Sequence, residues 1–136
     1  MNEISDKIFD KYITQNNHCC AAIYKSALES RGITVDDEEC LKYAGFSGGL
    51  SVGDSCGSLT GGILAIGALI HKGDEESFHI AKKATVEYYK RFEEEIGSTK
   101  CKENKLLYRR QPGMRCITLV EKAAQVLNEV LKKYGA

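Results

Sequence analysis

Four of the six cysteines in this chain occupy positions where their sulfur atoms could do chemistry. Cys20, Cys56 and Cys116 each fall near the predicted start of a helix, and Cys101 lies in a polar segment before the last predicted helix. A helix N-terminus carries unsatisfied N–H groups and roughly half a positive charge, which favours the thiolate over the thiol. Because the thiolate attacks disulfides and binds metals, three helix starts directed at one point would form an anionic sulfur site.

The sequence leaves the role of three further residues, His18, Cys19 and Cys40, undecided. His18 and Cys19 precede Cys20 at the same predicted helix start, and His18 is a candidate metal ligand. Adjacent residues on a helix point about 100° apart, so Cys19 and Cys20 cannot both face one site squarely. Cys40 lies on the inner side of a short helix, where a cysteine behaves as a small hydrophobe. No C-x-x-C pair occurs, so neither a zinc ribbon nor a thioredoxin-like motif is indicated.

The composition predicts one soluble globular domain spanning residues 1–136, with 43% hydrophobic and 28% charged residues. Nineteen basic and nineteen acidic residues cancel, so no overall field attracts nucleic acid or an anionic membrane. The opening residues are charged and lack an apolar core, which predicts no signal peptide and hence a reducing cytoplasm. The longest apolar stretch, residues 63–70, is too short to span a bilayer.

Apolar residues recur at helical spacing along the chain, and no segment alternates as a strand over more than four residues. The fold class is therefore predicted to be all-α, a bundle of five or six helices. The predicted helices are 3–15, 18–31, a short one through Leu41 and Tyr43, 56–71, 74–96 and 114–134. We expect Asn16 or Asn17 to cap the second helix and Asp54 or Ser55 to cap the fourth. Residues 98–113 are expected to form a polar link.

The helix predicted over residues 56–71 carries small residues on nearly every face, including Gly57 and Gly61. Each glycine costs a helix roughly 1 kcal/mol relative to alanine, so close approach of neighbouring helices is the expected compensation. This helix should therefore lie at the centre of the bundle. The preceding glycine-rich loop matches G-x-S-x-G at residues 45–49, but that nucleophile motif requires a preceding strand, and the segment before it is predicted helical.

The segment Cys56-Gly57-Ser58-Leu59-Thr60-Gly61 resembles the C-G-A-x-x-G motif of the C-GCAxxG-C-C family of redox-active proteins. The resemblance extends to Cys20 followed by alanine and to Cys101 and Cys116 downstream, and it covers roughly residues 15–130. Ser58 stands where the family has alanine. Cys19 and Cys40 lie outside the four-cysteine pattern.

The resemblance implies a prokaryotic redox protein with Cys20, Cys56, Cys101 and Cys116 as its catalytic or metal-binding residues. Gly57 and Gly61 are one turn apart beside Cys56, where another helix or a compact cofactor could approach the backbone.

Three functions remain open at this point. Four thiolates could hold an iron–sulfur cluster for electron transfer. They could instead exchange thiols and disulfides without a metal, with Cys56 or Cys20 attacking and Cys101 or Cys116 resolving. The alternative is a non-redox helical module with a structural Cys₄ zinc site. The expected partner is a redox protein of unidentified kind, with neither nucleic acid nor membrane insertion.

Overall fold

The computed structural model describes residues 3–109 and 113–136, and every regular element in these residues is a helix. This confirms the predicted all-α class. The α-helices are α1 Ser5–Phe9, α2 Cys19–Ser30, α3 Asp37–Leu41, α4 Gly57–Ile70, α5 Glu75–Ile96, α6 Cys101–Tyr108 and α7 Ile117–Lys133. Three short turns complete the set: π-helical turns at Asp10–Thr14 and Gly49–Gly53, and a 3₁₀ turn at Ala44–Phe46.

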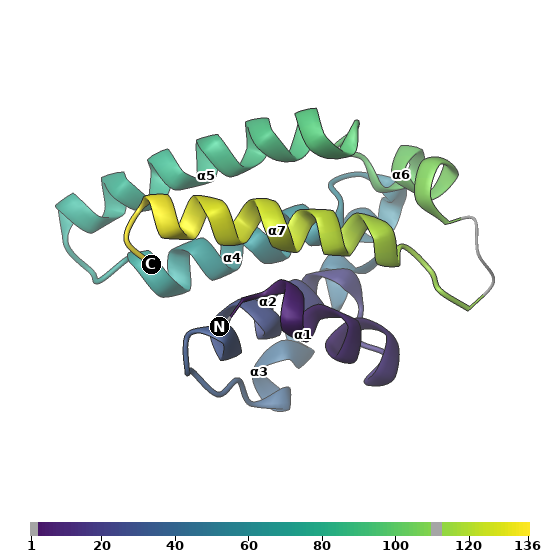
Figure 1. The fold of residues 1–136 in the computed structure, drawn as a ribbon, viewed down its shortest axis with the longest axis horizontal. Coiled ribbons are helices and arrows are strands. Elements are labelled where there is room, and N and C mark those ends of the chain that lie inside the picture. The colour runs from purple at the N-terminus through teal and green to yellow at the C-terminus, as the bar shows by residue number, and fades with distance from the viewer. Residues whose placement is uncertain (1–2, 110–112) are drawn as a thin grey trace.

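Helices α4, α5 and α7 run along the long axis of the molecule, and α1, α2 and α3 gather on one side of them (Figure 1). Helix α4 contacts α2, α5 and α7, which confirms its predicted central position. The core that these contacts enclose is apolar and closely packed, with Ile66, Tyr88, Phe92 and Leu127 fully buried. None of the described helices is long and apolar enough to cross a membrane.

Two glycines of α4, Gly61 and Gly62, allow the neighbouring helices to pack closely against it. A Cβ atom on Gly61 would lie 2.4 Å from the carbonyl oxygen of Cys20 in α2, and one on Gly62 would lie 2.4 Å from the ring of Tyr88 in α5. Contacts this short do not occur in folded proteins, so each position requires glycine. Gly67 differs, because a Cβ atom there would meet nothing within 4 Å. Close helix packing therefore offsets the helix propensity that the first two glycines cost.

The caps of two helices differ from the prediction. His18 caps α2, and its imidazole Nδ1 accepts a hydrogen bond from the Ala21 backbone N–H at 3.4 Å. Asn16 cannot do so because it adopts a left-handed backbone and its side chain binds Arg115. Helix α4 begins one residue after Cys56, which is itself the N-cap residue.

The second helix, α2, ends where predicted, before Gly32, whose φ of +79° suits glycine.

The predicted polar link after α5 contains a helix, α6, which begins at Cys101; residues 110–112 of that link lie outside the described residues. Tertiary contacts hold α6 in place. Its Asn104 is buried and donates to the Ser98 carbonyl, and the Tyr108 hydroxyl donates to the Ile96 carbonyl at 2.7 Å.

Helical spacing in α5 predicts Phe78 and Tyr89 on its inner face, but both are nearly half exposed. The buried residues of α5 are Ser77, Ala81, Ala84, Tyr88, Phe92 and Ile96.

Candidate functional site

Three cysteines line one cavity of about 150 Å³ at the end of the bundle where α2, α6 and α7 begin. Cys19 is the first residue of α2, Cys101 the first residue of α6, and Cys116 the N-cap of α7. We call this space the thiol cavity. Its other lining residues are Tyr12, His18, Ser47, Gly48, Lys105, Arg109 and Arg115.

Cys56 lies beside the thiol cavity because two loops pair with each other. Ser55 and Lys100 form an antiparallel bridge between the segments that precede α4 and α6. On either side of the bridge, the Cys56 N–H donates to the Thr99 carbonyl at 2.7 Å, and the Cys101 N–H donates to the Asp54 carbonyl at 2.6 Å. Cys56 and Cys101 are thus diagonal neighbours on one face of an antiparallel pair, and the nearby Cys101 is among the causes that raise the pKa of Cys56.

A shared partner, Tyr12, joins Cys19 to Cys116. The Tyr12 hydroxyl oxygen lies 3.6 Å from the Cys19 sulfur and accepts a hydrogen bond from the Cys116 backbone N–H at 2.9 Å. Burial is the main cause that raises the pKa of Tyr12 well above its usual value, so its hydroxyl stays protonated. Tyr12 therefore positions both cysteines through a neutral contact.

Arg115 holds the two chain segments around this tyrosine. Its guanidinium stacks on the Tyr12 ring, 3.9 Å from the ring centroid, and donates to the carbonyl oxygens of Tyr12 and Asn17. Arg115 itself has φ +51°, an uncommon conformation for a residue with a side chain. These contacts fix the segment before α2 against the segment before α7, so Cys19 and Cys116 have defined positions.

Cys20, one of the four cysteines of the predicted pattern, does not line the thiol cavity. It is fully buried in the α2–α4 interface, where the Thr60 hydroxyl hydrogen-bonds its thiol and the Gly61 backbone packs against it. Its sulfur interacts with Cys40 of α3. Of the two adjacent cysteines, it is therefore Cys19 that faces Cys116 and Cys101.

Burial raises the pKa of several thiols. The pKa of Cys19 rises to about 12, first because of burial and then because of the nearby Cys56. Burial also raises the pKa of Cys20 to about 11 and raises that of Cys56. At Cys56, the backbone N–H groups of Ser58 and Leu59 at the start of α4 act in the opposite direction, as the helix-start argument predicts, but burial outweighs them. The predicted shift of Cys56 toward the thiolate is therefore wrong in sign.

The thiol cavity carries positive charge. Lys105, Arg109 and Arg115 line it, and none of its described lining residues is acidic. Within the described part of the chain, neither Lys105 nor Arg109 forms an ion pair. Residue spacing did not predict Lys105 and Arg109 at the site, because they lie in α6 and at its end, where no helix was predicted.

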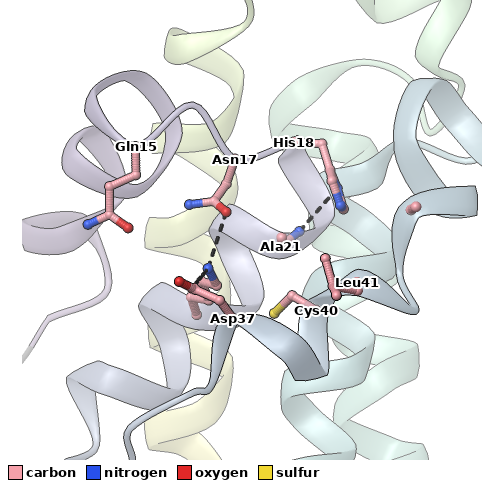
Figure 2. Close-up of a pocket in the computed structure, with 9 residues that line it drawn as sticks. Gln15, Asn17, His18, Ala21, Asp37, Cys40 and Leu41 are labelled. Atoms are coloured by element: carbon pink, nitrogen blue, oxygen red, sulfur yellow. Dashed lines mark hydrogen bonds and ion pairs between the residues drawn. The ribbon is translucent and has the colours of Figure 1, made fainter.

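A second and larger cleft, of about 480 Å³, is lined by residues of α2 and α3 (Figure 2). Cys40 lines it, together with the buried Lys25, whose ammonium group pairs with Asp37 and also donates to Asn17. We call it the Cys40 cleft.

His18 lines both spaces. Burial lowers the pKa of His18, and the charges of Arg115 and Lys25 lower it further, so the imidazole is neutral. Because its Nδ1 already caps α2, its role here is structural.

The described residues contain no group of three or more histidine, cysteine or acidic side chains placed to hold a metal ion. In the described residues the thiols are thus not gathered into a metal-binding group, and we derive no step through a metal. The predicted cofactor contacts, Gly57 and Gly61, face helix α2: a Cβ atom on Gly57 would lie 3.0 Å from the Cys19 Cβ. A helix, rather than a cofactor, occupies the space beside both glycines.

A model of one protein family matches residues 17–130, and its description is "Putative redox-active protein (C_GCAxxG_C_C)". The match spans most of the chain and includes the starts of six of the seven α-helices described above, together with every cysteine of the thiol cavity. Searches of curated proteins and of solved structures found no match. The chain belongs to the C_GCAxxG_C_C family.

Proposed function

We propose that this family member is a thiol–disulfide exchange protein that reduces a disulfide with Cys101 and Cys56 in a reducing cytoplasm. One observation carries the proposal: a partly exposed cysteine at the start of α6 lies across the Ser55–Lys100 bridge from a buried cysteine at the start of α4. An accessible thiol beside a buried one is the arrangement that attack and resolution require.

Cys101 is the attacking thiol in this proposal, because this residue is partly exposed and lines the cavity whereas Cys56 is only 4% exposed. These roles reverse those expected from the sequence, in which Cys56 or Cys20 attacked and Cys101 or Cys116 resolved. The reversal follows from burial, which hides Cys56 and Cys20 from a substrate.

The reaction proceeds in two exchanges. The Cys101 thiolate attacks one sulfur of the substrate disulfide, so a Cys101–substrate disulfide forms and the first substrate sulfur leaves as a thiolate that takes up a proton. Cys56 then loses its proton and attacks the Cys101 sulfur, forming the Cys56–Cys101 disulfide and releasing the second substrate thiol. The protein is oxidised by two electrons and the substrate disulfide is reduced to two thiols.

The positive lining of the cavity supports this chemistry. Lys105 lies one helical turn after Cys101 on the same helix, and Arg109 lies one turn further. Each exchange releases a thiolate from the substrate, and nearby cations stabilise such a developing negative charge. The cavity therefore suits a disulfide whose flanking groups are themselves anionic.

An iron–sulfur cluster for electron transfer and a structural zinc site remain the alternatives, and metal content separates them from thiol exchange. We expect protein purified without oxygen to lack visible absorption and to contain iron and zinc well below one atom per chain. A stoichiometric metal that survives dialysis and is lost in a Cys101→Ser variant would replace our proposal.

The exchange itself is tested with oxidised glutathione, a small anionic disulfide, and peptide mapping by mass spectrometry. We expect the reduced protein to form the Cys56–Cys101 disulfide. Cys56→Ser should accumulate a glutathione adduct on Cys101, because resolution is blocked, and Cys101→Ser should form neither product. Cys40→Ser serves as the matched control and should behave as the unaltered protein. A Cys101→Ser variant that is oxidised at the unaltered rate would overturn the proposal.

A further inference from the structure

We infer that Cys19 is an internal acceptor that passes the disulfide from Cys56 to Cys116, so that the protein holds two dithiol pairs instead of one. This inference rests on the proposed function. It concerns a cysteine outside the four-cysteine pattern, and it gives Cys19 and Cys116 a task that substrate reduction by Cys101 and Cys56 leaves open.

Cys19 lies next to the inner member of the first pair. The start of α2 packs so closely against the start of α4 that a Cβ atom on Gly57 would lie 3.0 Å from the Cys19 Cβ. Gly57 directly follows Cys56, so the glycine leaves the space between Cys19 and the first turn of α4 free of a side chain. The interaction between the Cys19 and Cys56 thiols, second only to burial among the causes that raise the pKa of Cys19, agrees with this proximity.

Cys19 also lies next to Cys116. Both residues line the thiol cavity, and both contact the hydroxyl oxygen of Tyr12, through the Cys19 sulfur and the Cys116 backbone N–H. Arg115, the residue before Cys116, stacks on the Tyr12 ring and donates to the Tyr12 carbonyl, so it ties Cys116 to Tyr12. Cys19 is therefore the one cysteine positioned between the Cys56–Cys101 pair and Cys116.

The transfer balances without any outside reagent. Cys19 attacks the Cys56 sulfur of the Cys56–Cys101 disulfide; the Cys19–Cys56 bond forms, and Cys101 leaves and takes up the proton that Cys19 lost. Cys116 then attacks the Cys19 sulfur, the Cys19–Cys116 bond forms, and Cys56 leaves as a thiol. Cys101 and Cys56 are reduced again, and the chain can reduce a second substrate disulfide.

Cys20 provides the contrast. It is the adjacent residue and belongs to the family pattern, yet it is fully buried against α4 and does not line the cavity. If sequence position alone decided the acceptor, Cys20 would serve as well as Cys19. The structure instead predicts that Cys19→Ser blocks transfer of the disulfide to Cys116, whereas Cys20→Ser does not.

The experiment compares Cys20→Ser with Cys19→Ser, because trypsin leaves both residues in one peptide, 12–25, and each variant retains only one of them. Each reduced variant is treated with excess oxidised glutathione, and disulfides are mapped over time. Cys20→Ser should show the Cys56–Cys101 disulfide first and the Cys19–Cys116 disulfide later, with four thiols lost in total. Cys19→Ser should stop after two, with Cys56–Cys101 alone.

Cys116→Ser is a second variant, in case Cys19→Ser fails to fold. This variant should also lose only two thiols, and its single disulfide should join either Cys56 to Cys101 or Cys19 to Cys56. A Cys20→Ser variant that never forms a Cys19–Cys116 disulfide overturns the inference while leaving the proposed function intact. A protein that forms no Cys56–Cys101 disulfide at any time overturns the proposed function, and the inference falls with it.

Discussion

The thiol cavity and the Cys40 cleft share His18 in their linings and differ in the residues that surround their cysteines. The smaller space has three cysteines and three cations on its walls. The larger one has a single cysteine, and its buried Lys25 is already paired with Asp37. Cys20, which interacts with Cys40, is closed off within the α2–α4 interface.

This comparison shows that the volume of a cavity is a poor guide to its chemistry. The Cys40 cleft has a volume of about 480 Å³, but only one cysteine lines it, and its lysine is paired. The thiol cavity has a volume of about 150 Å³, and three cysteines at helix starts line it. Lys105 and Arg109, which form no ion pair within the described residues, lie next to a partly exposed cysteine, and this distinguishes the region that we propose to be reactive.

The largest expected difference between the two regions is the rate of alkylation. In the reduced protein at neutral pH, Cys101 should react with iodoacetamide at least roughly 100 times faster than Cys20, because Cys101 is partly exposed whereas Cys20 is buried and its thiol has a pKa of about 11. Timed quenching and mass spectrometry give the order. Modification of Cys20 or Cys40 ahead of Cys101 would reverse the comparison.

The second prediction compares two glycines of α4, of which only Gly61 packs against the Cys20 backbone. Gly61→Ala should lower the free energy of unfolding by roughly 1–3 kcal/mol, since its Cβ would overlap the Cys20 carbonyl oxygen. Gly67→Ala, at an open position on the same helix, is the control and should raise stability by about 0.4–1 kcal/mol. Urea denaturation of both variants measures these changes. Equal effects at the two positions would mean that α2 and α4 do not pack as described.

Alkaline pH should weaken the fold through the buried thiols. The pKa of Cys20 is about 11 in the folded protein against an ordinary 9.0, so above pH 9 the unfolded chain releases a proton that the folded chain retains. The stability due to this thiol is fully present below pH 9 and is lost as the pH rises toward 11. Denaturation under reducing conditions from pH 7 to 11 should show the decline, and Cys20→Ser should make it shallower. An equally steep decline in that variant would assign the effect to other groups.

The smallest expected effect tests the charge of the thiol cavity. Lys105→Glu should slow oxidation by oxidised glutathione roughly threefold to tenfold, and it should not slow oxidation by cystamine, a cationic disulfide. High salt should reduce the difference. Lys83→Glu, on the exposed surface of α5, is the control with the same change in charge. Equal slowing with both disulfides would indicate that Lys105 supports the structure of α6 and does not select the substrate.

Much of the fold could be predicted from the chain, because its signals are local. Helical spacing gave the long helices, and the run of small residues in α4 indicated its central position, which its contacts with α2, α5 and α7 confirm. Helix α6 could not be predicted, because its sequence is polar and its position depends on distant partners of Asn104 and Tyr108.

The choice between Cys19 and Cys20 illustrates the limit at the site. Helix geometry indicated that only one of the two could face a shared point. Which one does so depends on the rotation of α2, and that rotation follows from the contact of the Cys20 backbone with Gly61 of α4. The spacing of residues within one helix does not determine which of them contact another helix.

The Ser55–Lys100 bridge has a consequence for the order of folding. It joins segments that are separated by the whole of α4 and α5, so it closes only after those two helices have formed and docked as an antiparallel pair. Closing so long a loop costs chain entropy that local helix formation does not, which makes such a contact late. Until then, Cys101 has no neighbour to resolve an adduct formed on it. The Cys56–Cys101 disulfide should thus appear only in chains that have completed folding.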